Sequence, residues 1–423
     1  MPWEGKVEFA GLTDTGLRRE NNQDSFALVP ATSDEAWKRH GHLYLVADGM
    51  GAHAVGELAS KVAADAIPLT YLKHSHRPAI DALRTAFETA NDAIQQRGQQ
   101  DPDFEGTGTT ATALVVHPDG VLIGHVGDSR VYRIRQRAIE QLSFDHSLSW
   151  ELTRRGHVKG GLRREFIPDN VITRSLGPEP TVQVDLEGPY DVQPGDVYVL
   201  CSDGLSGPVR DEEIGVIAGS LSPSEACRFL IDLANVRGGP DNITAVVVRL
   251  VPWETSARPS PVAPPAARGP LRLPVLFQTC WLTTVFVVGA VVWGMGYVRA
   301  AANTLLIGTA GAALAGAFAL WRHRRWQRIS ERNKRPYCTA ACELDGVMIR
   351  QTARMVSQLR QAAIEEDWPI DWRLFHAAHK RAESCALVEE WQPALREYGS
   401  AIHLLIRNAR SQRGAFPDRA ATV

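Results

Sequence analysis

Residues 1–252 are predicted to form an α+β domain with largely antiparallel sheet, followed by two long apolar stretches and a helical C-terminal region. Short apolar runs recur in the domain between turns rich in Gly, Asp and Pro. The dipeptide Asp119-Gly120 joins two of these runs as a hairpin turn. The predicted strands cluster as neighbouring hairpins, which is typical of antiparallel sheet and not of a doubly wound fold.

The individual elements follow from local patterns. Strands are expected on both sides of the 119–120 turn and at residues 43–47, 129–134, 182–187, 197–201 and 243–250. Alanine-rich segments at 51–67 and 80–96 are expected to be helices. Ser222-Pro223-Ser224-Glu225 is a capping box with proline at the first helical position, so a helix should begin there and end near Asn235.

Composition excludes several classes of protein. Apolar residues make up 44% and charged residues 22% of the chain, as in ordinary globular proteins. The formal net charge is -2, so no nucleic-acid partner is expected. The six cysteines are irregularly spaced, unlike those of a secreted disulfide scaffold, which favours reduced thiols in a cytosolic setting.

The chain changes in character after the first domain. Residues 253–272 form a linker rich in Pro and Ala. Two uncharged stretches then lie within 273–321, at about 274–297 and 301–321, and each exceeds the roughly 18 apolar residues of a membrane span. We expect two transmembrane helices that form a hairpin. The alternative is a pair of buried core helices in a soluble protein.

Basic residues flank this hairpin on both sides and are densest from Arg322 to Arg335. By the positive-inside rule, both flanks should lie in the cytoplasm. The predicted location is therefore the cytoplasmic (inner) membrane, as a multi-pass protein. Both the N-terminal domain and the C-terminal tail would face the cytoplasm.

Residues 322–423 are predicted to be a basic juxtamembrane segment followed by helices. Apolar residues recur at helical spacing across 344–359. Small residues at 378–386 would face 394–402 across a helix hairpin that looks like one tetratricopeptide-type unit. A single copy cannot stand as a solenoid, so we expect a small bundle or a surface for a protein partner.

Five aspartates follow apolar strands or lie in turns of the first domain. They are Asp24, Asp48, Asp128, Asp203 and Asp241. Each alone is most simply a turn residue, but five such positions suggest a hard-cation site. Oxygen ligands without His or Cys favour Mg²⁺ or Mn²⁺ over Zn²⁺. Arg19 precedes Asp24 by five residues and would suit a phosphate grip, unless it is an ordinary surface arginine.

The residues alone predict an oxygen-ligated divalent-metal site that could act on a phosphate. The order of the motifs along the chain makes the prediction more specific. These motifs are Thr13-Asp-Thr-Gly-Leu-Arg-Arg-Glu-Asn-Asn-Gln-Asp, Val46-Ala-Asp-Gly-Met-Gly, Gly106-Thr-Gly-Thr-Thr-Ala-Thr, Gly124-His-Val-Gly-Asp-Ser-Arg, Asp145-His-Ser-Leu, Asn170-Val-Ile-Thr-Arg-Ser-Leu-Gly, Leu200-Cys-Ser-Asp-Gly-Leu and Gly238-Gly-Pro-Asp-Asn-Ile-Thr. With this ordered set, the first 250 residues resemble the PPM (metal-dependent, type 2C) family of serine/threonine protein phosphatases, here in a bacterial membrane-anchored form.

The resemblance implies a four-layer α/β/β/α sandwich with two central antiparallel sheets and a binuclear Mn²⁺ or Mg²⁺ centre at one end. By motif position, Asp48 would bridge the two ions and Gly49 would offer its carbonyl oxygen. Asp203 and Asp241 would complete the centre, and Asn242 would support it.

The resemblance assigns further roles around this centre. Asp24 would act through a metal-bound water or directly. Asp128 with Asp203 would form a third, weaker ion site. Arg19 would bind the phosphate. Residues 153–172 match the family's mobile flap, whose arginines could meet the charge of a phosphopeptide.

The implied reaction is hydrolysis of phosphoserine and phosphothreonine on proteins by a metal-activated water, with Arg19 and Asp48 as the catalytic residues. No covalent phosphoenzyme is needed. Met50 stands where eukaryotic relatives place a histidine proposed as a general acid, so water would have to protonate the leaving group. Ala52 stands in place of a usual glycine, and we expect a mild effect.

Three alternatives stay open. The domain could be a catalytically silent phosphatase fold used as a membrane scaffold, which a failure to bind Mn²⁺ would favour. It could be a phosphatase of a small phosphorylated metabolite, which substrate competition would reveal. A zinc site is conceivable in the tail, although its loosely spaced residues lie far apart in sequence. These are Cys338, Cys342, His376 and His379.

The expected partners are phosphorylated proteins, namely a serine/threonine kinase and its substrates at the inner face of the membrane. The linker would hold the first domain close to that surface and raise its effective concentration there. We also expect that deleting the residues after about Val251 leaves a soluble, active enzyme.

Overall fold

The computed structural model describes residues 7–51, 55–104, 106–154, 171–251, 295 and 338–411. The described residues before 252 and after 337 belong to one compact unit. The predicted linker lies outside the described residues, and so does the predicted transmembrane hairpin apart from position 295. Of the helices that are described, none is both long and apolar enough to span a membrane.

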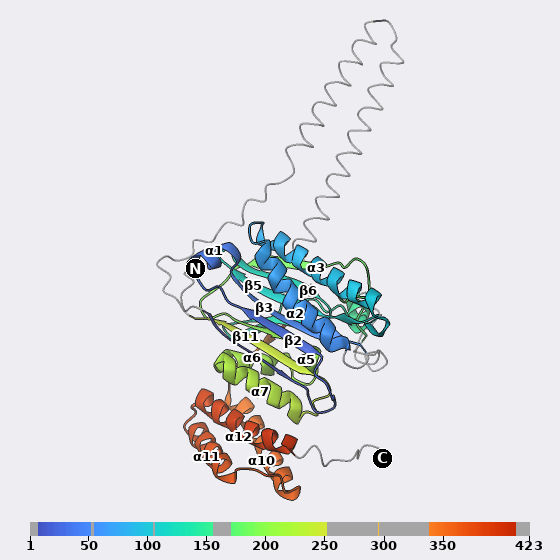
Figure 1. Ribbon diagram of the computed structural model, residues 1–423. Coiled ribbons are helices and arrows are strands. Elements are labelled where there is room, and N and C mark those ends of the chain that lie inside the picture. The colour runs from blue at the N-terminus through green and yellow to red at the C-terminus, as the bar shows by residue number, and fades with distance from the viewer. Residues whose placement is uncertain are drawn as a thin grey trace. The chain divides into compact units, whose positions relative to one another are not determined.

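Two antiparallel sheets lie at the centre of this unit (Figure 1). The strand order of the first sheet is β1 (Val7–Asp14), β11 (Ile243–Leu250), β10 (Val197–Cys201), β7 (Arg130–Arg135), β8 (Ala138–Gln141) and β12 (Cys338–Ala341). The order of the second is β2 (Asp24–Val29), β3 (His42–Met50), β5 (Ala111–His117), β6 (Gly120–Val126) and β9 (Asp185–Tyr190), with β4 (Gly108–Thr109) paired to β3. The predicted α+β fold with two antiparallel sheets is confirmed.

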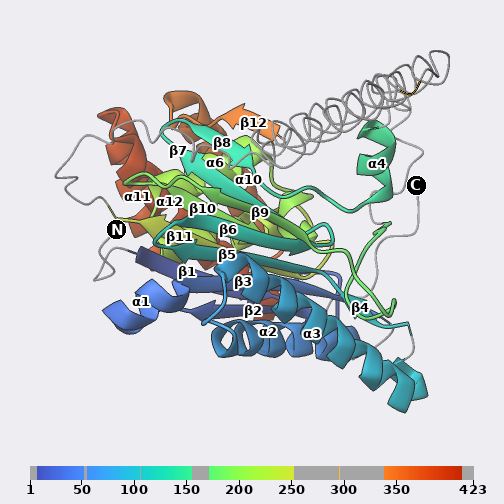
Figure 2. The same cartoon turned by 90° about the horizontal axis from the view of Figure 1, so that it is seen from above.

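Helices cover the outer faces of the sheets (Figures 1 and 2). On the second sheet lie α2 (Val55–Lys73) and α3 (Ala79–Gln100). On the first sheet lie α6 (Asp211–Ser220) and α7 (Pro223–Val236). The short helices are α1 (Asp34–His40), η1 (Pro102–Phe104), α4 (Leu148–Arg154) and α5 (Asp203–Ser206).

The central strands are buried on both faces. Tyr44 of β3, Leu114 of β5, Tyr198 of β10 and Val248 of β11 meet in the core between the sheets. The alternate residues of the same strands pack under the helices. This double burial explains why strand 243–250 is apolar along almost its whole length.

Local patterns place most elements well. The strands predicted at 197–201 and 243–250 have those bounds in the structure. The capping box forms, because the N–H of Ser222 donates to Glu225 Oε2 at 3.1 Å. The strand predicted at 182–187 instead spans Asp185–Tyr190, because its position is set by pairing with β6 across a register shift between Val121 and Ile123.

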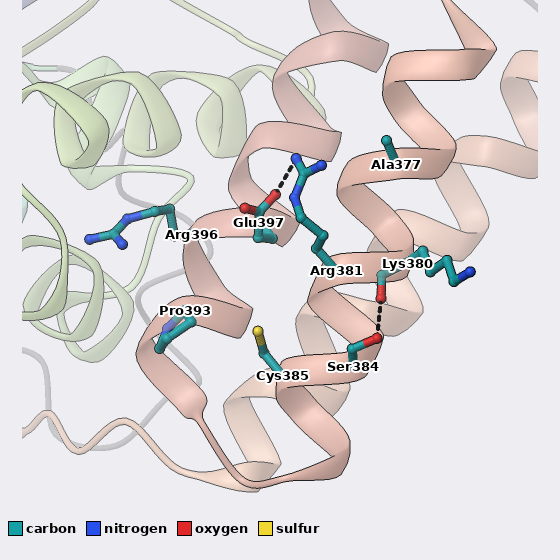
Figure 3. A pocket seen from close by; sticks show the side chains of 8 residues that line it. All are labelled: Ala377, Lys380, Arg381, Ser384, Cys385, Pro393, Arg396 and Glu397. Atoms are coloured by element: carbon teal, nitrogen blue, oxygen red, sulfur yellow. Dashed lines mark hydrogen bonds and ion pairs between the residues drawn. The ribbon is translucent and has the colours of Figure 1, made fainter.

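The C-terminal region contains α10 (Gly346–Glu365), α11 (Trp372–Leu387) and α12 (Trp391–Ser411). The predicted helix hairpin is confirmed, since Ala378 and Ala382 of α11 are buried together with Ala394 and Ile402 of α12. A pocket of about 320 Å³ lies between these two helices (Figure 3). On its rim, Arg381 donates to Glu397 at 2.8 Å.

This region packs on the first sheet and on α7 as an additional layer, which was not predicted from the sequence. Strand β12 pairs with β8 and extends the sheet by one strand. Gly399 of α12 lies against Phe229 of α7, where a Cβ atom would be 2.8 Å from the phenyl ring. Polar contacts add to the interface: Arg396 with Glu225 (2.9 Å), His403 with Asp232 (2.9 Å) and Gln392 with the carbonyl of Ser220 (2.6 Å).

Candidate metal centre

Two of the predicted carboxylates lie on neighbouring strands of the second sheet. Asp24 begins β2 and is paired in register with Asp48 near the end of β3. The backbone of Asp48 is fixed on its other side, because its N–H donates to Thr110 Oγ1 at 2.9 Å and its carbonyl accepts from the Thr110 N–H at 2.8 Å. Gly49 lies so close to Gly56 that a Cβ atom would be 2.0 Å from the Gly56 carbonyl oxygen.

Two more carboxylates come from the first sheet. Asp203 follows β10 and opens α5, and Asp241 lies in the turn before β11. Asn242 ties this turn to the loop before β2. Its Oδ1 accepts from the N–H of Gln23 at 2.7 Å, and its Nδ2 donates to the carbonyl of Thr15 at 2.9 Å. The ends of both sheets are thus held together where the aspartates meet.

Asp128 lies just after β6 and joins the same cluster. Burial, followed by the negative charges of Asp24, Asp203, Asp128 and Asp241, raises the pKa of Asp48 well above its ordinary value. The structure therefore brings all five predicted aspartates together, although they come from distant parts of the chain.

The other carboxyl groups respond to the same surroundings. Burial is the largest cause in each case: it raises the pKa of Asp24 to about 7 and that of Asp128 to about 8, and it also raises the pKa of Asp203. Each of these three groups keeps one buried carboxylate oxygen with no hydrogen-bond partner among the described residues. Buried acceptors of like charge without a donor are the groups that a bound cation would satisfy.

The donor set fits hard divalent cations. All five side chains offer oxygen only, which suits Mn²⁺ or Mg²⁺. Within the ranges that the structure describes, no group of three His, Cys, Asp or Glu side chains is already arranged to hold one ion. Mg²⁺ usually keeps several water molecules in its shell and is bound through one or two carboxylates.

Arg19 lies at the edge of this cluster. Its Nη2 donates to Asp241 Oδ2 at 2.8 Å, and about half of the side chain (53%) is exposed. The hydrogen bond to Asp241 is the main cause that raises the pKa of Arg19, and the charges of Asp48 and Asp203 add to it. An exposed guanidinium beside the carboxylates can reach an incoming anion.

Two hydroxyl groups at this site were not singled out from the sequence. Ser202 Oγ and Thr244 Oγ1 donate to Asp24 Oδ2 at 2.7 and 2.6 Å, and both residues are fully buried. They fix the orientation of the Asp24 carboxylate. A signal existed, since each is a small polar residue at the end of an otherwise apolar strand beside a predicted ligand. Of the predicted flap, residues 155–170 lie outside the described residues, and so does Ala52.

The family model described as protein phosphatase 2C matches residues 17–235. The chain belongs to the protein phosphatase 2C family. Serine/threonine protein phosphatase PstP of Mycobacterium tuberculosis is 33% identical over 251 residues, which are 59% of this chain and 46% of PstP. Protein phosphatase PhpP of Streptococcus pneumoniae is 32% identical over 249 residues, which are 58% of this chain and 98% of PhpP.

A solved structure supports the same assignment. The PPM Ser-Thr phosphatase MsPP from Mycobacterium smegmatis, crystallised with cacodylate, is 35% identical with a TM-score of 0.50, and the match covers 58% of this chain and 99% of MsPP. As a member of the protein phosphatase 2C family, this chain is a serine/threonine protein phosphatase. Phosphatases of this family use Mn²⁺ or Mg²⁺.

Proposed function

We propose that this phosphatase hydrolyses phosphoserine and phosphothreonine on proteins, using a water activated at a binuclear Mn²⁺ or Mg²⁺ centre. The observation that carries the proposal is the cluster of five aspartates, three of which keep a buried oxygen without a hydrogen-bond partner in the described part of the chain. When bound, the cations supply the activated water and neutralise charge on the phosphate.

Each residue has a distinct role in this proposal. Asp48 would hold both ions, because it lies among the other four carboxylates. The other ligands would be Asp24, the carbonyl oxygen of Gly49, Asp203 and Asp241, and Asp128 with Asp203 would hold a third, weaker ion. Asn242 supports them by holding the loops in place.

Arg19 is the phosphate-binding residue. Its fork of N–H donors matches two phosphate oxygens, and these would share the guanidinium with Asp241. Met50, half-buried at the end of β3, cannot exchange a proton. The leaving hydroxyl of the substrate must then take its proton from water.

A phosphothreonine peptide and the full chain provide the test. We expect turnover that requires Mn²⁺ and stops when EDTA is added. Loss of an outer-sphere partner of a metal commonly lowers metal affinity or activity by about 10–100-fold. Asp203→Asn alters a ligand itself, so it should lower turnover by more than about 100-fold. Asp119→Asn is the matched control, because that carboxylate is 82% exposed on a hairpin turn. No turnover by a folded chain that still binds Mn²⁺ would favour the silent scaffold.

We further propose that residues 273–321 anchor the phosphatase in the cytoplasmic membrane as a two-helix hairpin, close to a serine/threonine kinase and its substrates. The two uncharged stretches support this. Two spans also return the chain to the side of the membrane on which the first domain lies. The pairing of β12 with β8 requires this, because the two strands belong to the same sheet. Carbonate extraction of bacterial membranes tests the anchor: the full chain should stay in the pellet, and complete release would refute it.

A further inference from the structure

The loop that carries Asp128 is clamped by the segment that contains Asp145. The N–H of Gly127 donates to Nδ1 of His146 at 2.9 Å, and the N–H of His146 donates back to the carbonyl of Gly127 at 2.7 Å. Since Nδ1 of His146 is an acceptor here, its Nε2 carries the proton and donates to Asp185 at 3.1 Å. Any movement of residues 145 and 146 is thereby passed to Gly127 and its neighbour Asp128.

Asp145 is held in turn by Arg130 of β7. Arg130 Nη2 donates to Asp145 Oδ2 at 2.6 Å, and its Nε lies 3.1 Å from both carboxylate oxygens. Asp145 is almost fully buried. Gln141 at the end of β8 also donates to Asp145 Oδ1, at 2.9 Å. A charged fork of this kind fixes both partners in one geometry.

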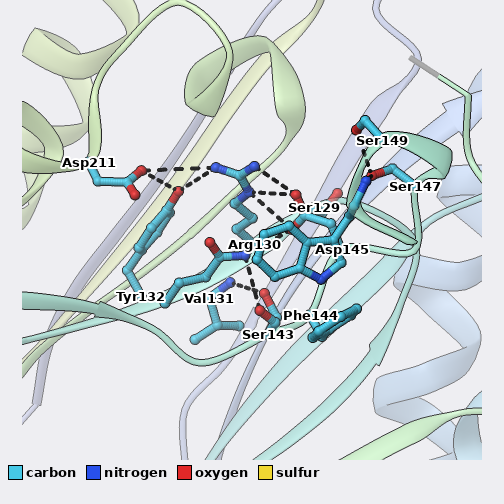
Figure 4. A network of polar contacts seen from close by, with 12 residues as sticks. Ser129, Arg130, Val131, Tyr132, Ser143, Phe144, Asp145, Ser147, Ser149 and Asp211 are labelled. Carbon is cyan, nitrogen blue, oxygen red and sulfur yellow. Dashed lines mark hydrogen bonds and ion pairs between the residues drawn. The ribbon is translucent and has the colours of Figure 1, made fainter. Parts of the chain in front are cut away.

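The other side of Arg130 leads to α6 (Figure 4). Arg130 Nη1 donates to the hydroxyl of Tyr132 at 3.0 Å, and that hydroxyl donates to Asp211 Oδ1 at 2.8 Å. Asp211 is the first residue of α6, and its carboxylate lies 3.9 Å from Arg130 Nη1. The Tyr132 hydroxyl therefore bridges the arginine to the start of the helix.

Strand β12 reaches this network through β8. Cys338 is paired in register with Gln141, which donates to Asp145. We name this path the Asp211 relay; it consists of Asp211, Tyr132, Arg130, Asp145 and Gln141.

We propose that Asp211 and Tyr132 are positioning residues for Asp128, and that the Asp211 relay makes cation binding at Asp128 depend on the docking of β12. The inference rests on the proposed role of Asp128 as a ligand of the third, weaker ion site. The C-terminal helices follow β12 directly, so their attachment to the domain adjusts a metal ligand that they do not touch. Outer-sphere partners of this kind are commonly worth about 10–100-fold in metal affinity.

Calorimetric titration of Mn²⁺ into the metal-free full chain tests the relay without using turnover. Tyr132→Phe removes only the bridging hydroxyl, and we expect the weakest class of Mn²⁺ sites to lose about tenfold in affinity. Tyr198→Phe is the matched control. Tyr198 is equally buried on the neighbouring strand, and its hydroxyl lies 3.5 Å from Asp196, outside the relay. Equal Mn²⁺ binding by the two variants would overturn the proposal.

A second pair of variants tests the link to β12. The N–H of Cys342 donates to the carbonyl of Arg137 at 2.9 Å, so by alternation the N–H of Ala340 faces β8 and that of Thr339 faces away. Ala340→Pro should weaken the same class of Mn²⁺ sites, and Thr339→Pro should not. If both prolines leave Mn²⁺ binding unchanged, β12 does not act on Asp128.

The outcomes separate this inference from the proposed function. A wild-type chain that binds no Mn²⁺ at all refutes the metal centre itself. Tight Mn²⁺ binding with no difference between Tyr132→Phe and Tyr198→Phe refutes only the relay. If Tyr132→Phe fails to fold, Mn²⁺ titration of Asp211→Asn takes its place as the test of the relay. This variant keeps an acceptor for the Tyr132 hydroxyl and removes only the charge beside Arg130.

Discussion

A buried ion pair at the start of α6 gives a stability prediction that can be worked out from the structure. Both Glu213 oxygens accept from Arg237, Oε2 from Nη1 and Oε1 from Nη2, each at 2.7 Å. Glu213 also accepts from the N–H of Arg210 at 3.1 Å and so caps the helix. Its side chain is only 7% exposed, whereas that of Arg237 is 27% exposed.

The pKa of Glu213 sets how much this ion pair contributes to the free energy of unfolding. Burial acts to raise it, but the hydrogen bonds and charges of Arg237 and Arg210 outweigh burial and lower it from 4.5 to about 2. That difference corresponds to about 3 kcal/mol, which solvent around the partly exposed arginine reduces to about 2 kcal/mol. Because the folded-state pKa is depressed, this stability is complete above pH of about 4.5 and is lost as the pH falls toward about 2.

Urea unfolding of the full chain at two pH values tests the argument. We expect Glu213→Gln to lower the free energy of unfolding by about 2 kcal/mol at neutral pH. At a pH of about 4 the difference from wild type should shrink by somewhat less than 1 kcal/mol, because the unfolded wild-type chain begins to take up a proton. Glu212→Gln, at the exposed neighbouring position, is the control. A difference from wild type that is the same at both pH values would refute the reasoning.

Two further changes probe close contacts. Gly16 has φ 77° and a Cβ there would lie 2.0 Å from the Asp241 carbonyl oxygen, whereas Gly195 has φ 86° and open space around it. In thermal unfolding, Gly16→Ala should therefore lose more stability than Gly195→Ala, by about 1–3 kcal/mol. In Mn²⁺ titration, Gly16→Ala should weaken binding and Gly195→Ala should not. Phe229→Ala should cost about 3–5 kcal/mol and speed hydrogen exchange in α12, and unchanged exchange would contradict the packing described for Gly399.

Local patterns predicted the parts of the fold that local physics decides. The strand at 197–201 is a short β-branched run between turns, and the helix after Ser222 carries its own cap. Helix α6 was not predicted, because it is buried almost all round and shows little periodicity. The bounds of β9 depend on the partner strand β6, which a sequence window does not contain.

The same limit applies to the site and to the C-terminal region. The aspartates stood out because they follow apolar strands or lie in turns, but the hydroxyls that orient Asp24 lie at the ends of two other strands. The apolar face of α12 was visible from its spacing, whereas the surface that it covers on α7 was not. Activity of a chain that ends near Val251 stays a prediction. The shared core gives a physical reason to expect such a chain to be less stable.

The late arrival of β12 in the chain has a consequence during synthesis. Strand β8 is left with an open edge, and α7 with an uncovered apolar face, until residues 338–411 have been made. Residues 252–337 come in between, and at about 5–20 residues per second their translation takes roughly 4–17 seconds. For at least that time the nascent domain exposes a strand edge on which another chain can pair, so chaperone demand and aggregation of nascent chains should depend on translation speed through this stretch.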